Sequence, residues 1–249
     1  MNSRIVRGRE SKPPRILLYG TEGIGKTTFA AGAPKPIFIP TEDGLGELEV
    51  DRFPLCEDFE SVLGHLAWLI DGAHDYETVV IDSLDWLERL IHDHVCAQNN
   101  VDTIERVDGG YGRGYLAALA QWRKVLSFLQ KLRDDRSMIV LLIAHAKIER
   151  FEDPETLAYD RYMPRLHRSS AALVTEWCDA VFFAHWRFAL RTEQGTFGKS
   201  RNIPLAGPNA DRVMRVSGGP TCVAKNRYGL TGELPLDWNA FARAVVKEG

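Results

Sequence analysis

The segment GTEGIGKT, residues 20–27, constrains what this chain folds into more than any other part of its sequence. It fits the pattern G-x-x-x-x-G-K-S/T, whose glycines let a loop wrap around phosphate groups with its N–H groups pointing inward. An apolar run, RILLYG, precedes the loop, and KTTFAAGA, which suits a short helix, follows it. This context predicts a phosphate-binding loop, and a plain turn between a strand and a helix is the alternative.

We expect this loop to bind Mg-ATP. The Lys26 ammonium would neutralise the β- and γ-phosphates during catalysis, and the Thr27 hydroxyl would coordinate Mg²⁺. The residues expected to contact the nucleotide are Gly20, Thr21, Glu22, Gly23, Ile24, Gly25, Lys26, Thr27 and Thr28.

Apolar runs alternate with helical periods along most of the chain. The apolar runs are residues 15–20, 36–40, 78–82 and 138–145. The segments with a helical period are residues 26–33, 57–72, 84–95 and 115–133. The run MIVLLIAH is apolar throughout, as expected of a parallel strand that is covered on both faces. This alternation predicts a doubly wound α/β fold.

The last third of the chain has a different pattern. AVFFAHWRFAL and RVMRVS are predicted to be antiparallel strands, and a helix is expected near residues 236–247. We therefore predict one α/β domain over residues 15–249, with a mostly parallel twisted sheet flanked by helices and antiparallel strands in its C-terminal third. Residues 1–14 are predicted to be a flexible basic arm.

Composition excludes several classes of protein. No apolar run approaches the roughly 18 residues that span a bilayer, and the basic, polar start lacks the features of a secretion signal. The chain has 249 residues, a formal net charge of −3, and four scattered cysteines, Cys56, Cys96, Cys178 and Cys222. This cysteine spacing argues against zinc or disulfides and predicts a cytoplasmic protein with no membrane partner.

Acidic and histidine side chains follow three of the predicted strands. Asp82 ends VVID and is expected to hold Mg²⁺; an exposed strand-end aspartate is the alternative. Glu42, just after PIFIP, is the candidate base for hydrolysis; the adjacent Asp43 in that role, or Glu42 as an ordinary loop acid, are the alternatives. His145 ends MIVLLIAH, where it would contact the γ-phosphate or the attacking water, or be a core histidine. Glu42 and Asp82 are expected at the same carboxyl edge of the sheet as Gly20, where ligands bind in such folds.

These segments together resemble the RecA-type recombinase ATPases, especially the compact recombination and single-strand-annealing ATPases of bacteriophages. FIPTE is similar to the segment that ends in the catalytic glutamate of that family, which supports Glu42. VVIDSLDWL is similar to its second nucleotide motif. IVLLIAHAK is similar to its sensor strand, which often ends in Asn or Gln, so His145 departs from the family pattern.

VAKNRYG, residues 223–229, resembles an element in which cations reach the γ-phosphate of a neighbouring subunit. The resemblance implies a catalytic role in trans for Lys225 and Arg227, and a surface ion pair is the alternative. Residues 187–227 are also locally basic, which suits phosphate contacts or an oligomer interface. The cations are Arg187, Arg191, Lys199, Arg201, Arg212, Arg215, Lys225 and Arg227.

In RecA-type proteins two mobile loops contact single-stranded DNA, and by position these correspond to residues 99–114 and 147–170. Arginine and aromatic side chains there suit backbone neutralisation and base stacking, although acidic residues in the second segment leave a solvated loop as the alternative. The DNA-binding candidates are Arg106, Tyr111, Arg113, Lys147, Arg150, Arg161, Tyr162, Arg165 and Arg168.

The resemblance implies a DNA-stimulated ATPase that assembles on single-stranded DNA as a filament or ring and promotes annealing or strand exchange. Its cofactors would be ATP and Mg²⁺. Its partners would be single-stranded DNA, further copies of the chain and a single-strand-binding protein, in the host cytoplasm if the protein is phage-encoded. A hexameric helicase-like motor or loader, an ATP-switched mediator without turnover, and a small-molecule kinase are the alternatives.

Overall fold

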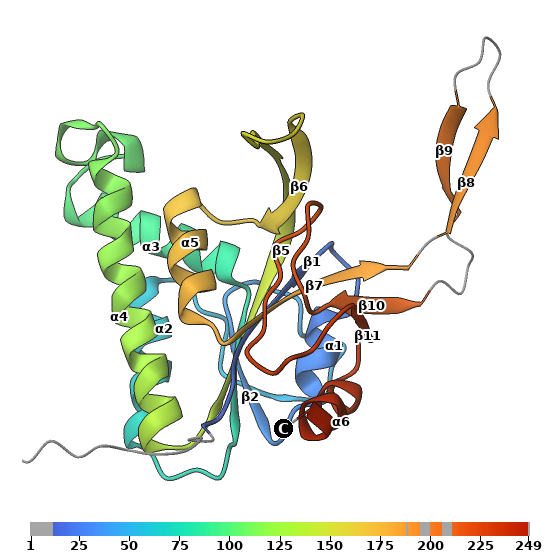
Figure 1. Ribbon diagram of the computed structural model, residues 1–249. Coiled ribbons are helices and arrows are strands. Elements are labelled where there is room, and N and C mark those ends of the chain that lie inside the picture. Colours follow the sequence, from blue (N-terminus) through green and yellow to red (C-terminus); the bar gives the residue numbers. More distant parts are fainter. Residues whose placement is uncertain (1–11, 188, 195–199, 206–210, 249) are drawn as a thin grey trace, which may run out of the picture.

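The computed structural model describes residues 12–187, 189–194, 200–205 and 211–248. Within these residues a nine-stranded sheet has the order β11-β10-β7-β1-β5-β4-β2-β3, and β6 pairs with an extension of β5 (Figure 1). Its mutually parallel strands are β1 (Arg15–Gly20), β2 (Pro36–Pro40), β3 (Asp51–Arg52), β4 (Thr78–Asp82), β5 (Ile139–Phe151) and β7 (Ala180–Trp186). Its antiparallel strands are β6 (Tyr159–Pro164), β10 (Arg212–Arg215) and β11 (Glu233–Pro235).

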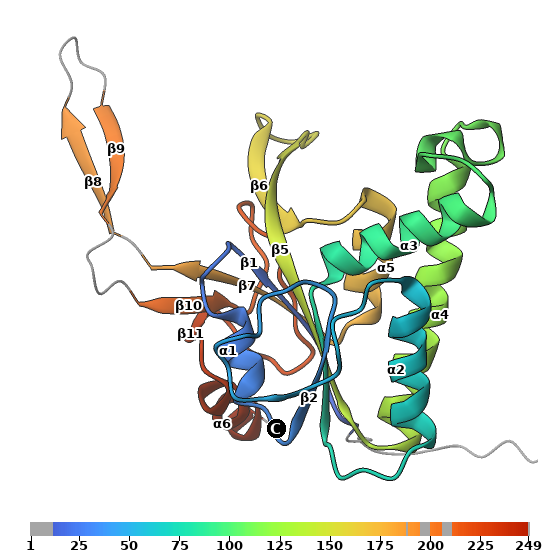
Figure 2. The ribbon, with the colours of Figure 1, turned by 180° about the vertical axis from the view of Figure 1, so that it is seen from behind.

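Helices cover both faces of this sheet (Figures 1 and 2). One face carries α2 (Phe59–Asp71), α3 (Leu84–Gln98), α4 (Arg113–Asp135) and α5 (Arg168–Trp177), and the other carries α1 (Lys26–Ala31) and α6 (Trp238–Glu248). Successive side chains of a strand point to opposite faces, so Leu17 and Tyr19 join the first core, whereas Ile16 and Leu18 join the second. The predicted α/β fold class is confirmed, and β5 lies between β1 and β4.

The strand register brings the predicted site residues to one edge. Gly20, at the end of β1, pairs with His145 of β5. Asp82, at the end of β4, pairs with Ile143 of β5 and with Pro40 at the end of β2. Because these strands are parallel, the loops that follow them all leave at the same carboxyl edge.

Two segments differ from the sequence prediction. The predicted loop 99–114 contains a short 3₁₀ helix, η1 (Ile104–Gly109), whose Ile104 and Val107 are buried, and α4 begins within it. The predicted loop 147–170 is mostly ordered structure, because β5 continues to Phe151 and pairs with β6 before α5 begins. The run AVFFAHWRFAL is also divided, between β7 and β8 (Ala189–Gln194), which pairs with β9 (Ser200–Leu205).

The first described residues of the chain are hydrogen-bonded to α4 and β5. Of the predicted arm, residues 1–11 lie outside the described part; Pro13 accepts a hydrogen bond from Arg133 Nε at 2.6 Å, and Pro14 accepts one from Val140 N at 3.0 Å. All four cysteines are buried, free thiols. Among the helices described, none combines the length and the apolar character needed to cross a membrane.

Candidate nucleotide site

A cleft of about 620 Å³ lies at the carboxyl edge of the sheet, over the loop that follows β1. It brings together the phosphate loop, the segment after β2, the end of β4 and the end of β5. Its lining residues are Glu22, Gly23, Gly25, Lys26, Thr27, Thr28, Glu42, Asp43, Gly44, Leu48, Asp82, Trp86, His145, Arg165 and Arg212.

The phosphate loop wraps around its own lysine. Lys26 Nζ donates to the carbonyl oxygens of Gly20, at 3.2 Å, and Thr21, at 2.9 Å. Burial lowers the pKa of Lys26, while the charges of Asp82 and Glu42 act in the opposite direction. Gly25 has φ +103°, a left-handed conformation that a residue with a Cβ rarely adopts. The loop thus holds a buried ammonium beside a glycine backbone, as phosphate binding requires.

Thr27 and Asp82 form the candidate metal ligands. Thr27 Oγ1 donates to Asp82 Oδ2 at 2.8 Å. Burial raises the pKa of Asp82 to about 6, assisted by the Glu42 charge, although the Thr27 hydrogen bond and Lys26 lower it. A buried carboxylate beside a hydroxyl provides the oxygen ligands that Mg²⁺ prefers. No cluster of three or more His, Cys, Asp or Glu side chains that could hold a metal occurs among the described residues, so Mg²⁺ would also need substrate phosphates.

Glu42 and His145 face each other in the cleft. His145 Nδ1 lies 4.0 Å from Glu42 Oε1. Both side chains line the same cavity as Lys26 and Thr27. Asp43 lines it too, so the structure leaves both acids in reach of a bound phosphate.

Asp85, which the sequence did not single out, organises this end of the cleft. It is 5% exposed and accepts hydrogen bonds from the His145 backbone N–H at 3.0 Å and from Arg165 Nη2 at 2.8 Å. The His145 ring is also tied to it, with Nδ1 at 3.0 Å from Asp85 Oδ2. Burial opposes ionisation of Asp85, but these hydrogen bonds outweigh it and keep the pKa of the carboxyl well below its usual range.

Arg165, a DNA-binding candidate from the sequence, lines the nucleotide cleft. Its guanidinium bridges Asp85 and the phosphate loop, where Nη1 lies 3.4 Å from Glu22 Oε1. The β6 strand returns the chain to the nucleotide cleft immediately before this residue. Sequence offers one signal for Asp85: it lies three residues after Asp82, in the first turn of the helix that leaves the same edge.

Lys225 and Arg227 lie away from this cleft. Lys225 pairs through its backbone with Val181, near the start of β7, and Arg227 Nη1 lies 3.5 Å from Asp179 Oδ1. Asp179 is bonded to Arg15, at the start of β1, so this position is roughly 16 Å along the sheet from Gly20. These cations are not positioned to serve the phosphates of their own chain.

Asn226 braces the loop between these two cations. Its Nδ2 donates to the carbonyl oxygens of Val216, at 2.7 Å, and Leu230, at 2.8 Å. Its Oδ1 accepts from the backbone N–H groups of Tyr228 and Leu230. The K-N-R order thus places an internal brace between two cations that already have partners. Lys225 Nζ donates to the Glu176 carbonyl oxygen at 3.2 Å, and Arg227, whose side chain is 65% exposed, pairs with Asp179.

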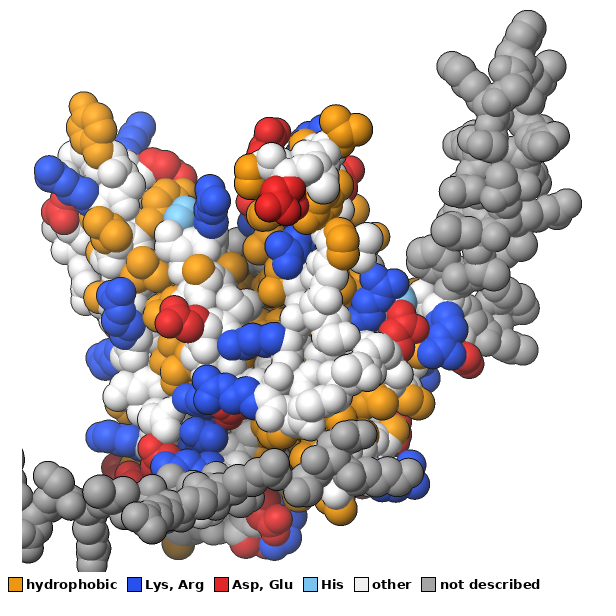
Figure 3. Space-filling view, viewed as in Figure 1, with side chains coloured by type: hydrophobic (Ala, Val, Ile, Leu, Met, Phe, Trp, Pro, Cys, Tyr) orange, Lys and Arg blue, Asp and Glu red, His pale blue; other side chains and the backbone are white. Residues whose placement is uncertain are grey.

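The two predicted DNA segments rise from the same edge of the molecule, on either side of a hollow in the surface (Figure 3). On the η1–α4 side, Tyr111 is fully exposed, and Arg106 forms an exposed ion pair with Asp102 at 3.5 Å. Arg113 Nη1 donates to the Asp108 carbonyl oxygen at 2.9 Å.

The β5–β6 side of the hollow is more restricted. Lys147 pairs with Glu149 at 3.1 Å, and Arg150 pairs with Asp160 at 3.9 Å. Arg161 lies over the Phe151 ring, and Arg168 is exposed. The Tyr162 ring stacks on Phe183 with a centroid distance of 4.7 Å, so it packs inward. The side chains of Arg191, Lys199 and Arg201 lie outside the described part.

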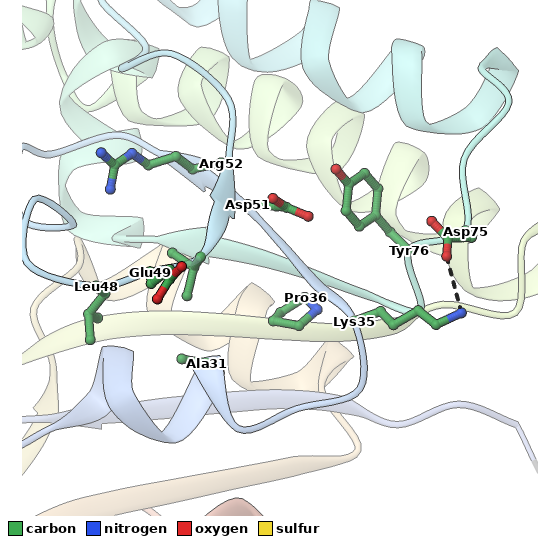
Figure 4. A pocket seen from close by; sticks show the side chains of 10 residues that line it. Ala31, Lys35, Pro36, Leu48, Glu49, Asp51, Arg52, Asp75 and Tyr76 are labelled. Carbon is green, nitrogen blue, oxygen red and sulfur yellow. Dashed lines mark ion pairs between the residues drawn. The ribbon is translucent and has the colours of Figure 1, made fainter.

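A second cavity, of about 650 Å³, lies between the end of α1, the start of β2 and the segments that precede β3 and β4 (Figure 4). Both of its cations have partners: Lys35 pairs with Asp75 at 3.3 Å, and Arg52 Nη1 donates to the Leu45 carbonyl oxygen at 2.7 Å. Although this cavity is slightly larger, it contains no residue of the phosphate loop. We therefore place the nucleotide site in the cleft above the loop.

Comparison with known proteins agrees with this architecture. Residues 12–228 match the AAA domain family. The chain belongs to this family. The AAA domain is 27% identical over 148 residues to the SPbeta prophage-derived uncharacterized protein YorG of Bacillus subtilis (strain 168), a match that covers 58% of this chain and 44% of YorG. The chain thus spans less than half the length of that relative.

Among solved structures, the AAA domain is similar to the crystal structure of the RadB recombinase. The TM-score is 0.48 at 14% sequence identity, and the match covers 92% of this chain and 90% of that one.

Proposed function

We propose that this AAA domain is a Mg²⁺-dependent ATPase that binds single-stranded DNA and acts as a homo-oligomer in recombination or annealing. The observation that carries the proposal is the convergence of Lys26, the Thr27–Asp82 pair and Glu42 on one cleft. RecA-type resemblance and a prophage-derived relative support a phage recombination role. Four buried free thiols suit a reducing cytoplasm, that of the host if a phage encodes the protein.

The residues divide the hydrolysis between them. Lys26 exchanges the carbonyl oxygens of Gly20 and Thr21 for the β- and γ-phosphates. Thr27 and Asp82 would hold Mg²⁺, which neutralises phosphate charge in such sites. Glu42 accepts a proton from the water that attacks the γ-phosphorus, and ADP leaves as the bond to its β-phosphate oxygen breaks. His145, oriented by Asp85, contacts the γ-phosphate or this water.

The position of Lys225 and Arg227 supports an oligomer. Along the sheet, Arg227 lies roughly 16 Å and Lys225 roughly 10 Å from the phosphate loop of its own chain, and we propose that both cations act on the site of a neighbouring subunit. A single chain should then hydrolyse ATP slowly. DNA would favour assembly, and thereby turnover, by occupying the hollow between the η1–α4 tip and the β5–β6 hairpin.

Steady-state ATP hydrolysis with and without single-stranded DNA tests this function. We expect DNA to stimulate the wild type, and Lys26→Ala and Glu42→Gln to abolish turnover. Turnover that ignores DNA would overturn the DNA-related role and favour a small-molecule kinase. Unwinding of a forked duplex would instead favour the helicase-like alternative, and DNA binding without turnover would favour an ATP-switched mediator.

A matched pair on α4 tests the DNA surface. Arg113 begins this helix beside the hollow, whereas the exposed Lys131 lies 18 residues further along, about 27 Å away. Both substitutions to alanine remove one positive charge. Only Arg113→Ala should weaken DNA binding. It should also reduce, by about one, the slope of the logarithm of affinity against the logarithm of salt concentration. Equal effects of the two would show that general charge, and not this hollow, attracts DNA.

A further inference from the structure

Arg212 lies directly against the phosphate loop, although the loop motif does not include it. It begins β10 and pairs across the sheet edge with Trp186 of β7. Its Nη1 lies 2.9 Å from the position that a Cβ on Gly25 would take. The guanidinium is therefore in contact with the last glycine of the loop, next to Lys26, and it lines the same cleft.

Arg212 differs from the cations near it because no described side chain pairs with its guanidinium. Arg165 is neutralised by Asp85 and Glu22, and Arg215, on the same strand as Arg212, is paired with Glu233. The nearby Asp211 pairs with Arg187, at 3.5 Å. Among the described residues, no carboxylate or carbonyl oxygen binds the Arg212 guanidinium. An exposed, unpaired cation thus faces the loop that is expected to hold phosphates.

A guanidinium in this position suits phosphate chemistry. Its planar set of N–H donors matches two phosphate oxygens at once, and unlike a lysine it stays charged when a ligand covers it. Glycine suits position 25 because its φ is +103°, and a Cβ there would also come within 2.9 Å of Arg212 Nη1. Bound phosphates would then be held from two sides, by Lys26 of α1 and by Arg212 of β10.

We propose that Arg212 is a phosphate-binding residue of the nucleotide site in the same chain, acting as a second cation beside Lys26. This inference rests on the proposed nucleotide site. It assigns to the last third of the chain a direct contact with substrate. It also separates Arg212 from Arg227, whose action requires a neighbouring subunit.

The test compares the affinities of ATP, ADP and inorganic tripolyphosphate for wild type, Arg212→Ala and Arg212→Lys by calorimetry. Arg212→Ala should weaken all three by about tenfold to a hundredfold, as expected for a lost charged hydrogen bond. Arg212→Lys should lose less. Arg187→Ala is the control. Arg187 follows Trp186, which pairs with Arg212 across the strands, so this variant removes a nearby positive charge, and it should change each affinity less than threefold. The melting temperature of Arg212→Ala should not fall, because the residue has no partner within the described part.

Three results would overturn the proposal. If Arg212→Ala weakens ATP and ADP but leaves tripolyphosphate unchanged, Arg212 contacts the base or ribose. If Lys26→Ala weakens all ligands while Arg212→Ala weakens none, Arg212 is an ordinary strand-end cation and the nucleotide site still stands. A wild type that binds none of the three ligands overturns both this proposal and the nucleotide site.

Discussion

Replacing Asp82 with asparagine should stabilise the nucleotide-free protein. Its carboxyl is buried, and its pKa is raised to about 6, whereas an unfolded aspartate titrates near 3.9. The folded state therefore binds more protons than the unfolded state between these values, so stability falls as the pH rises through this window. The difference of about two pKa units corresponds to roughly 3 kcal/mol at pH 7.5. Asparagine removes this cost and still accepts the Thr27 hydrogen bond.

We expect Asp82→Asn to raise the free energy of unfolding by about 2 kcal/mol at pH 7.5, because burial of the amide offsets part of the gain. At pH 4 the gain should be small. Urea unfolding at both pH values, without nucleotide and with a chelator present, measures it. The same variant should lose Mg²⁺-dependent nucleotide binding. A substitution that stabilises the fold and removes the ligand is typical of a site strained for function.

Asp85→Asn is the matched control, because Asp85 is an equally buried acid whose pKa is shifted in the opposite direction. The ionised Asp85 carboxyl contributes to the free energy of unfolding. This contribution is fully present above the pKa of an unfolded aspartate and is lost as the pH falls through the lower pKa of the folded state. Asp85→Asn should thus destabilise the protein by about 2 kcal/mol at pH 7.5, since it breaks the pair with the partly exposed Arg165. Loss of stability in Asp82→Asn, or a gain that is the same at pH 4 and pH 7.5, would refute the reasoning.

Two further predictions concern Asp179 and Arg227, which lie near the starts of β1 and β7. Asp179→Asn should lower the free energy of unfolding by about 3 kcal/mol, because it leaves the nearly buried guanidinium groups of Arg15 and Arg133 without their carboxylate; urea unfolding measures this, and a loss below 1 kcal/mol would contradict the account. Glu42→Gln and Arg227→Ala should each be inactive alone. In an equal mixture that assembles at random, roughly a quarter of the interfaces combine an intact Glu42 with an intact Arg227 of the neighbouring subunit, and these should hydrolyse ATP. No regained activity in a mixture shown to co-assemble would contradict catalysis in trans.

The phosphate loop and its acids were predictable because they depend on local rules. Residues 20–27 are contiguous, and their strand and helix context is visible in the sequence. Glu42, Asp82 and His145 follow from the rule that parallel strands end at one edge, and the structure brings them to one cleft. Their chemical roles remain predictions.

Asp85, Arg165 and Arg212 were not predictable in the same way. The hydrogen-bond partners of Asp85, His145 and Arg165, are 60 and 80 residues further along the chain. In the sequence, Asp85 looks like any other polar residue of an amphipathic helix. Arg165 returns to the cleft only because β6 folds back along β5. Arg212 lies against the phosphate loop because β10 pairs with β7, which is itself next to β1. The sequence shows only that Arg212 belongs to a basic stretch.

The measurement that tests the central claim most directly is calorimetric binding of ATP, with Mg²⁺ and with a chelator, to wild type and Lys26→Ala. We predict that the wild type binds ATP in the presence of Mg²⁺, that the chelator weakens this binding, and that Lys26→Ala weakens it at least about tenfold, since a charged contact is lost. An unchanged far-UV circular dichroism spectrum would show that Lys26→Ala remains folded. A wild type that does not bind ATP, or a folded Lys26→Ala that binds it equally well, would contradict the account.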